Sequence, residues 1–139
     1  MNILDTRDLI EEREENKQTI LESFLETFEQ YAEQTESFED ILFEEEEIES
    51  WKEQFEYELN LIKEIDELEE EILNGEWEYG TTLIEEDEFE EYCEDLLIDC
   101  GYISKDFPSW IVIDWENTTD NMKQDYSEVE FRGTTYLYR

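Results

Sequence analysis

The sequence predicts a mostly α-helical protein with a small α+β end, in which a long antiparallel helical hairpin precedes a compact module of two helices and a β-hairpin. Apolar residues recur every three or four positions over the first half of the chain, which is the helical period. Two alternating runs joined by Arg132-Gly133 are typical of a β-hairpin. Because the composition changes after Gly75, we expect an acidic two-helix coiled hairpin over residues 1–75 and an acidic α+β module over residues 76–139.

A first helix is predicted from Arg7 to about Gln34, a segment without glycine or proline. Asp5 or Thr6 is the expected N-cap residue, because short polar side chains accept hydrogen bonds from the free N–H groups of a helix start. The helix would bury one apolar stripe, formed by Leu9, Ile10, Ile20, Leu21, Phe24, Leu25, Phe28, Tyr31 and Ala32.

A second long helix is predicted to start at a capping box formed by Ser37 and Asp40 and to end at Asn74-Gly75. Such a helix would reach about 50 Å at 1.5 Å per residue. We expect the aromatic part of its stripe to form the core of the hairpin or a seam between two copies of the chain. The stripe contains Ile41, Ile48, Trp51, Phe55, Leu59, Ile62, Ile65, Leu68 and Ile72.

The second half is predicted to hold a third helix, which begins after Thr81–Ile84 and ends at Gly101. Asp114 is the expected N-cap of a short fourth helix with Trp115 and Met122 turned inward. A lone β-hairpin is marginal in water, so it should pack on these helices. We expect the alternating residues Val129, Phe131, Tyr136 and Tyr138 to face that core.

The charge of the chain is extreme, with 45 acidic against 9 basic residues and a formal net charge of 9 − 45 = −36. Acidic chains with few aromatic residues usually remain disordered. This chain has 4 Trp, 8 Tyr and 8 Phe, and 38% of its residues are hydrophobic, so we expect it to fold. Self-repulsion costs stability, and its persistence therefore indicates a use.

Acidic side chains are predicted to line up along the helices, because spacings of three and four place them on one helical edge. Lysines interspersed among the acids would normally relieve the repulsion in such rows, and lysines are nearly missing here. The row on the first helix is Glu22, Glu26, Glu29, Glu33 and Glu36. The row on the second helix is Glu46, Glu49, Glu53, Glu56, Glu64, Glu67 and Glu71. The third helix carries Glu86, Asp87, Glu90, Glu91, Glu94 and Asp95.

Catalysis has little support in the sequence, which has no histidine and no glycine-rich phosphate loop. We expect no enzyme, no cofactor and no defined metal site, since the loop of a typical calcium site is also missing. Cys93 and Cys100 would lie about 10 Å apart on a helix, too far for a disulfide, and are expected as reduced core thiols. Without an apolar run of membrane length or a basic leader, a cytoplasmic protein is expected.

The second half of the chain resembles small acidic proteins of bacteriophages and, more distantly, the last domain of ArdA-type antirestriction proteins. The resemblance lies in Phe89–Tyr92 (FEEY), Ile113–Glu116 (IDWE) and Asp125–Tyr136, where the pattern is DY…VEF.G.TY. The opening Leu4–Glu12 resembles the phage proteins, whereas residues 18–74 hardly do. The chain departs from the antirestriction pattern at residues 121–124, where a basic pair and Leu are usual.

The resemblance implies DNA mimicry, in which such a protein occupies the DNA-binding cleft of a restriction-modification enzyme. The charge points the same way, because 36 charges match about 18 base pairs, or about 60 Å, of B-DNA. The expected partner is thus a basic DNA-binding host protein, with no membrane and no direct contact to nucleic acid, and a homodimer remains open. The alternatives are a mimic aimed at RNA polymerase, a nucleoid protein or a CRISPR effector, and an acidic structural or adaptor protein.

Overall fold

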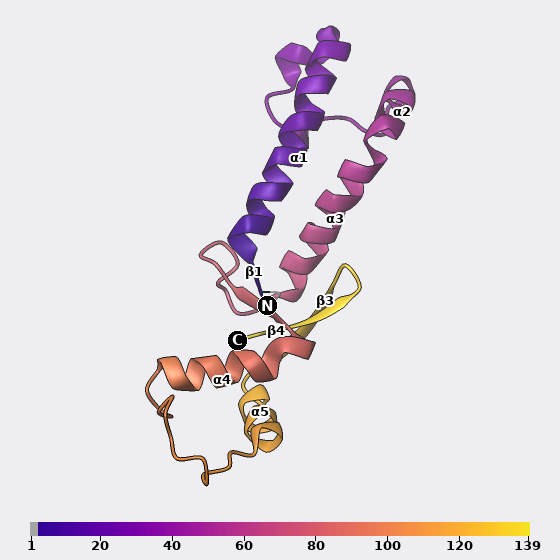
Figure 1. Cartoon of the computed structure of the whole chain (residues 1–139). Coiled ribbons are helices and arrows are strands. Elements are labelled where there is room, and N and C mark those ends of the chain that lie inside the picture. The colour runs from indigo at the N-terminus through magenta and orange to yellow at the C-terminus, as the bar shows by residue number, and fades with distance from the viewer. Residues whose placement is uncertain (1–2) are drawn as a thin grey trace. The chain divides into compact units, whose positions relative to one another are not determined.

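The computed structural model describes residues 3–139, which form two compact units. The helical unit comprises residues 7–70. The sheet unit combines residues 71–139 with the segment before residue 7, whose strand β1 (Ile3–Asp5) pairs with strand β2 (Thr82–Glu85). The predicted fold class is confirmed, because the chain is mostly helical with one small antiparallel sheet (Figure 1). The prediction placed one boundary near residue 75. It missed that the first residues of the chain belong to the sheet unit.

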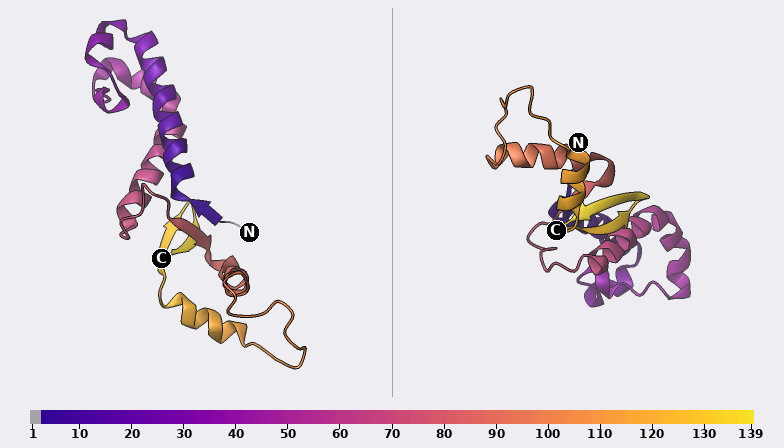
Figure 2. Two further views of the ribbon diagram at one scale, coloured as in Figure 1. Left: turned by 90° about the vertical axis from the view of Figure 1, so that its left-hand side faces the viewer. Right: turned by 90° about the horizontal axis from the view of Figure 1, so that it is seen from below.

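The helical unit is an antiparallel hairpin in which α1 lies beside α3 (Figure 2). Its elements also include short 3₁₀ segments, labelled η. In chain order they are α1 (Thr6–Thr27), η1 (Glu29–Gln34), η2 (Phe38–Asp40), α2 (Glu46–Lys52), η3 (Glu53–Phe55) and α3 (Glu56–Glu71).

The first helix is shorter than predicted, because α1 ends at Thr27 and a 3₁₀ segment replaces its last turns. Phe28 leaves the helical conformation with φ −120° and ψ 66°. Its ring centroid lies 5.3 Å from that of Phe24, with the rings tilted, and 5.9 Å from that of Trp51, in the edge-on geometry that aromatic pairs favour. Packing of the aromatic core therefore ends this helix, although no glycine or proline interrupts it.

The second predicted helix is interrupted, so the expected single helix of about 50 Å is wrong. Ile41 is extended, and α2 starts only at Glu46, inside the four consecutive glutamates Glu44–Glu47. A helix through all four would place Glu44 and Glu47 at helical spacing, where like charges repel. Starting at Glu46 places Glu46, Glu47 and Glu49 in the first turn, where the helix dipole favours negative charge. At the other end, α3 stops at Glu71, three residues before Asn74.

The capping box of Ser37 and Asp40 is confirmed, but it caps the 3₁₀ turn η2 rather than a long helix. The Asp40 carboxylate accepts hydrogen bonds from the backbone N–H groups of Ser37 and Glu36, each at 3.0 Å. These bonds stabilise the charged form, so the pKa of Asp40 is lower than usual.

Asp40→Ala is expected to destabilise the chain at pH 7, because both N–H groups lose their acceptor. A lowered pKa in the folded state means that Asp40 contributes stability above its unfolded pKa of about 3.9 and loses it as the pH falls through the folded value. The difference between wild type and variant should therefore shrink in acid. Urea unfolding at pH 7 and pH 2.5 measures both differences, and an equal difference at the two values would contradict the role of the charge.

The core of the helical unit is aromatic. Trp51 is 5% exposed, and its indole N–H donates a hydrogen bond of 3.0 Å to the hydroxyl of Ser23. Phe24, Ile48 and Ile62 are buried with it, and Phe28, Phe43 and Phe55 pack against them. The stripe around Trp51 thus forms the core within one chain.

The sheet unit contains a four-stranded antiparallel sheet in the order β1-β2-β4-β3. Its remaining elements are η4 (Glu86–Glu88), α4 (Phe89–Asp99), α5 (Trp115–Lys123), β3 (Ser127–Phe131) and β4 (Thr134–Tyr138). The predicted hairpin is confirmed: Arg132 and Gly133 take φ values of 51° and 77°, the left-handed values of a tight two-residue turn.

Strands β1 and β2 were not predicted. Thr81–Ile84 was expected only as a lead into the third helix, whereas Thr82–Glu85 forms a strand that pairs with Ile3–Asp5 and with β4. Thr6 anchors this pairing rather than capping a helix, since its hydroxyl donates to the carbonyl of Trp77 and accepts from the N–H of Thr81. The hydrogen bond to Trp77 is 2.9 Å long, and the one from Thr81 is 2.8 Å long.

The face of the sheet that packs on the helices also differs from the prediction. Ile84 and Leu137 form the core with Phe89 and Cys93, and Tyr92, Met122 and Tyr126 pack against it. Pleating places Leu137 on the face opposite to its neighbours in β4. The expectation that Val129, Phe131, Tyr136 and Tyr138 face this helical core is therefore wrong, although all four are buried.

Candidate functional site: the acidic helical surfaces

The acidic residues of the chain are exposed or half-buried, and one carboxylate oxygen, Oε2 of Glu58, is buried without a hydrogen-bond partner. None of the 45 acidic side chains, which all lie in the described residues, is buried. Every acidic position of the three predicted rows is exposed except Glu64 and Glu94, which are half-buried. The molecule thus presents its anionic groups outward, as the rows predict.

The row of the first helix is split between two kinds of helix. Glu22 and Glu26 lie on α1, Glu29 and Glu33 lie on η1, and Glu36 follows it. Because a 3₁₀ segment has a different period and follows the break at Phe28, the five carboxylates do not continue one straight edge. The prediction of a continuous ladder on this helix is wrong.

The row of the second helix crosses three elements. Glu46 and Glu49 lie on α2, Glu53 lies on η3, and Glu56, Glu64, Glu67 and Glu71 lie on α3. The structure brings Glu49, Glu53 and Glu56 to one shallow surface depression, which Lys52, Leu59 and Asn60 also line. This depression thus gathers three carboxylates of the predicted row beside one lysine.

The third row lies in the sheet unit. Glu86 and Asp87 belong to η4, and Glu90, Glu91, Glu94 and Asp95 follow on α4. Glu86 accepts a hydrogen bond of 2.9 Å from Lys123, and this contact raises the pKa of Lys123. One member of the row therefore joins α5 to η4, and the others are exposed except the half-buried Glu94.

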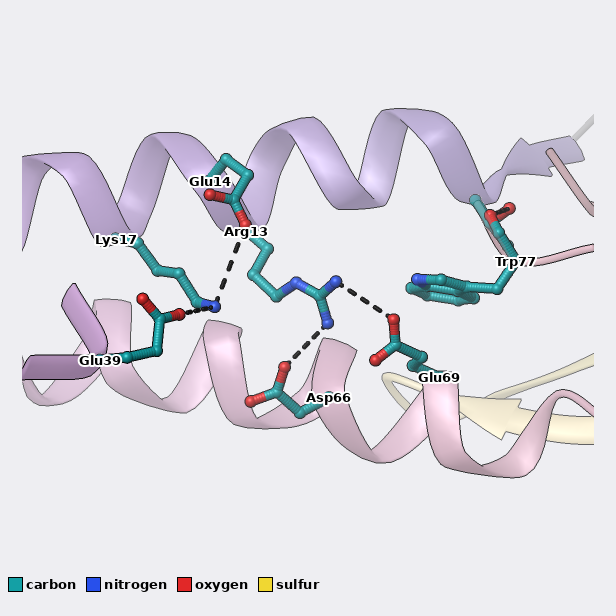
Figure 3. A network of polar contacts seen from close by, with 8 residues as sticks. Arg13, Glu14, Lys17, Glu39, Asp66, Glu69 and Trp77 are labelled. Atoms are coloured by element: carbon teal, nitrogen blue, oxygen red, sulfur yellow. Dashed lines mark hydrogen bonds and ion pairs between the residues drawn. The ribbon is translucent and has the colours of Figure 1, made fainter. Parts of the chain in front are cut away.

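Two of the few cations lie inside the helical unit, where they join its helices (Figure 3). Arg13 of α1 is 8% exposed and donates to Asp66 of α3 at 2.8 Å and to Glu69 at 3.3 Å. Lys17 is half-buried and donates to Glu39 of η2 at 2.8 Å, which lowers the pKa of Glu39. Positive charge is thus placed between the helices.

Burial alone would lower the pKa of Arg13, but the hydrogen bonds and charges of Glu69 and Asp66 outweigh it and raise the pKa. The guanidinium fork suits this double contact, because one planar group reaches two carboxylates at once. Arg13 therefore remains charged and fixes the spacing of α1 and α3.

The sequence reading missed Arg13 and Lys17, although a signal for them exists. The apolar stripe of α1 has a gap between Ile10 and Ile20. Arg13 and Lys17 fall at intervals of four after Leu9, on the same helical face as the buried Ile20. A cation at a core-facing position of an acidic chain is the pattern that identifies an internal ion pair.

The structure gives little support for metal binding or for a reactive thiol. Among the residues that the structure describes, no cluster of three or more Cys, Asp or Glu side chains is arranged to hold a metal ion. Cys93 is buried, and burial together with the charge of Glu90 raises its pKa to about 11, so thiolate is scarce at neutral pH. Cys100 is exposed, so the expectation of two core thiols is wrong for that residue.

No helix within residues 3–139 combines the length and apolar character that a bilayer crossing needs. The fold and its surface define an acidic protein with an aromatic core and outward carboxylates. No known protein family matches the sequence, and no curated protein or solved structure resembles it closely enough to count as a match.

Proposed function

We propose that the protein is a DNA mimic that occupies the DNA-binding cleft of a restriction-modification enzyme and so inhibits it. The observation that carries this proposal is the division of charge: none of the 45 acidic residues is buried, whereas Arg13 and Lys17 bind carboxylates between helices. Self-repulsion of an anionic surface costs stability. A surface that keeps this cost, with two of the nine basic residues paired between helices, fits a partner that is itself cationic.

The dimensions of the helical unit fit a short duplex. Residues 7–70 hold 25 acidic and 5 basic residues, a net charge of 5 − 25 = −20. The 22 residues of α1 span about 33 Å, close to one turn of B-DNA. One turn of duplex carries about 20 phosphates. The unit thus offers a comparable charge over a comparable length.

The resemblance of the second half to phage proteins and to ArdA-type antirestriction proteins favours a restriction-modification enzyme among basic partners. The adaptor alternative loses its main support, because the aromatic stripe that would have mediated assembly is buried within one chain. RNA polymerase, a nucleoid protein or a CRISPR effector would be recognised by the same chemistry, so they belong in the test as further targets.

Displacement of DNA tests the proposal directly. A purified restriction-modification enzyme is loaded with a fluorescent 30-base-pair duplex that contains its site, and the protein is added at 50 and 200 mM NaCl. We expect the duplex to be released at 50 mM, and affinity for the mimic to fall by about 100-fold or more at 200 mM. Polyglutamate of equal total charge is the control for charge without structure.

The proposal fails if the duplex stays bound at 50 mM NaCl with an excess of the protein, or if polyglutamate displaces it equally well. Release of DNA only from RNA polymerase, a nucleoid protein or a CRISPR effector would retain mimicry and overturn the assignment to restriction enzymes.

A further inference from the structure

The connection between α4 and α5 is a long loop (Figure 1), and it exposes large apolar side chains. Residues 107–113, here called the apolar turn, form the longest uncharged run of a chain in which 39% of residues are charged. Trp110 is 79% exposed and Val112 is 88% exposed. Burying side chains of this size would stabilise the fold, so their display in solvent needs a reason.

The apolar turn has a hydrogen bond at its tip, and hydrogen bonds also fix the loop near the end of α4 and at the start of α5. The N–H of Ile111 donates to the carbonyl of Pro108 at 3.0 Å, which places Trp110 at a central position of a β-turn. Before the turn, Gly101 takes φ +77° and lets the N–H of Tyr102 reach the carbonyl of Leu97 at 3.0 Å. These contacts reduce the entropy that a partner must remove when it binds Trp110.

The end of the turn is fixed by the N-cap of α5. Asp114 accepts a hydrogen bond of 3.1 Å from the backbone N–H of Asn117, as the sequence predicts, and a second of 2.6 Å from its side chain. Trp110 and Val112 are therefore presented by a segment anchored at the end of one helix and the start of the next.

The charges around the apolar turn identify the kind of partner. Residues 99–116 contain Asp99, Asp106, Asp114 and Glu116 against the single base Lys105, and all five are exposed. A second copy of the chain would bring the same acids to the contact. A basic protein with an apolar pocket would instead neutralise the rim while it buries Trp110, which is how strong interfaces combine a central aromatic residue with a polar edge.

We propose that the apolar turn is a second contact with the target, in which Trp110 and Val112 enter an apolar pocket beside the DNA-binding cleft of the basic partner. This inference rests on the proposed function. It adds a contact that DNA cannot make, so the mimic gains affinity and selectivity beyond what charge alone provides.

The test compares two double variants in the displacement assay. W110S with V112S removes the proposed contact. L73S with Y79S removes exposed apolar side chains elsewhere in the sheet unit, since Leu73 is 84% and Tyr79 is 74% exposed. We expect the first pair to weaken displacement by about tenfold or more with an unchanged salt dependence. The control pair should stay within about twofold of wild type.

Far-UV circular dichroism and urea unfolding show whether the variants fold, and the single variant W110S replaces the pair if the pair does not. If the wild type displaces DNA and W110S/V112S displaces it equally well, the docking contact is overturned and the proposed function is retained. Failure of the wild type to displace DNA overturns both. Sedimentation that shows a wild-type dimer and a monomeric W110S/V112S variant would assign the turn to a second copy and also overturn the inference.

Discussion

Replacing Glu46, Glu49, Glu53 and Glu56 together by lysine is expected to abolish displacement of duplex DNA. The change moves the net charge from −36 to −28 and puts four cations where a basic cleft expects phosphates. Glu49, Glu53 and Glu56 share one surface depression, so their reversal acts on one contact area. Like charges facing each other across an interface cost several kcal/mol, and we therefore expect at least about 100-fold weaker displacement.

The helical signal of this variant should remain intact. The four lysines repeat the like-charge spacing of the glutamates that they replace, and only position 49, four residues after Glu45, gains an opposite charge at helical spacing. Lysine in the first turn of α2 is unfavourable for the helix dipole, which offsets this gain. Far-UV circular dichroism measures the outcome, and unfolding would make the loss of displacement uninformative about the surface.

A matched control carries the same change of charge outside the predicted rows. Lysine at Glu76, Glu78, Asp120 and Asp125, which are all exposed, again gives a net charge of −28. This variant should keep most of its displacement. Equal loss in both variants would mean that total charge matters rather than its placement, and unchanged displacement in the first would exclude that row as the contact.

The features that the sequence predicts well depend on local chemistry. Arg132-Gly133 marks the hairpin because few other residue pairs adopt two successive positive φ values. Gly101 follows the end of α4 with a positive φ, and Asp114 caps α5. Both features depend on residues that are close in the chain. Strands β1 and β2 have only three and four residues, and the pairing of Ile3 with Ile84 joins distant segments. No local pattern specifies such a pair.

The helix breaks depend on tertiary packing, which the helical period does not record. The apolar spacing continues through Phe28 and through Ile41, yet the chain bends at both positions. At Phe28 the bend lets the ring pack on Trp51 at 5.9 Å. At Ile41 it lets the side chain reach the core, where it is 5% exposed. Burial of large side chains outweighs the small preference for continuing a helix.

The exposure of the acidic rows was predictable, whereas their continuity was not. Helical spacing places Glu22 and Glu26 outside because the opposite face is apolar. The same spacing beyond Thr27 assumes that the helix continues, and it ends there. The internal cations escaped prediction because charged residues are expected on the surface. Only the position of Arg13 on the core-facing stripe distinguishes it from a solvated base.

Arg13→Met is expected to destabilise the helical unit by about 2–3 kcal/mol. Removing one partner of a buried ion pair costs about 3–5 kcal/mol because the other charge is left uncompensated. The cost is smaller here, since the Asp66 and Glu69 side chains are 53% and 42% exposed and water solvates them in part. Methionine keeps apolar contacts in the gap, so most of the loss reflects the charge.

Urea unfolding measures this loss, and Lys63→Met provides the matched control. Lys63 contacts Glu67 at 4.0 Å with both side chains largely exposed, so its removal should cost less than about 1 kcal/mol although the net charge changes equally. Adding Asp66→Asn and Glu69→Gln to Arg13→Met should restore part of the stability, because no unpaired carboxylate then remains. Equal losses in Arg13→Met and Lys63→Met would show that overall repulsion, and not a bridge between α1 and α3, governs the stability of this unit.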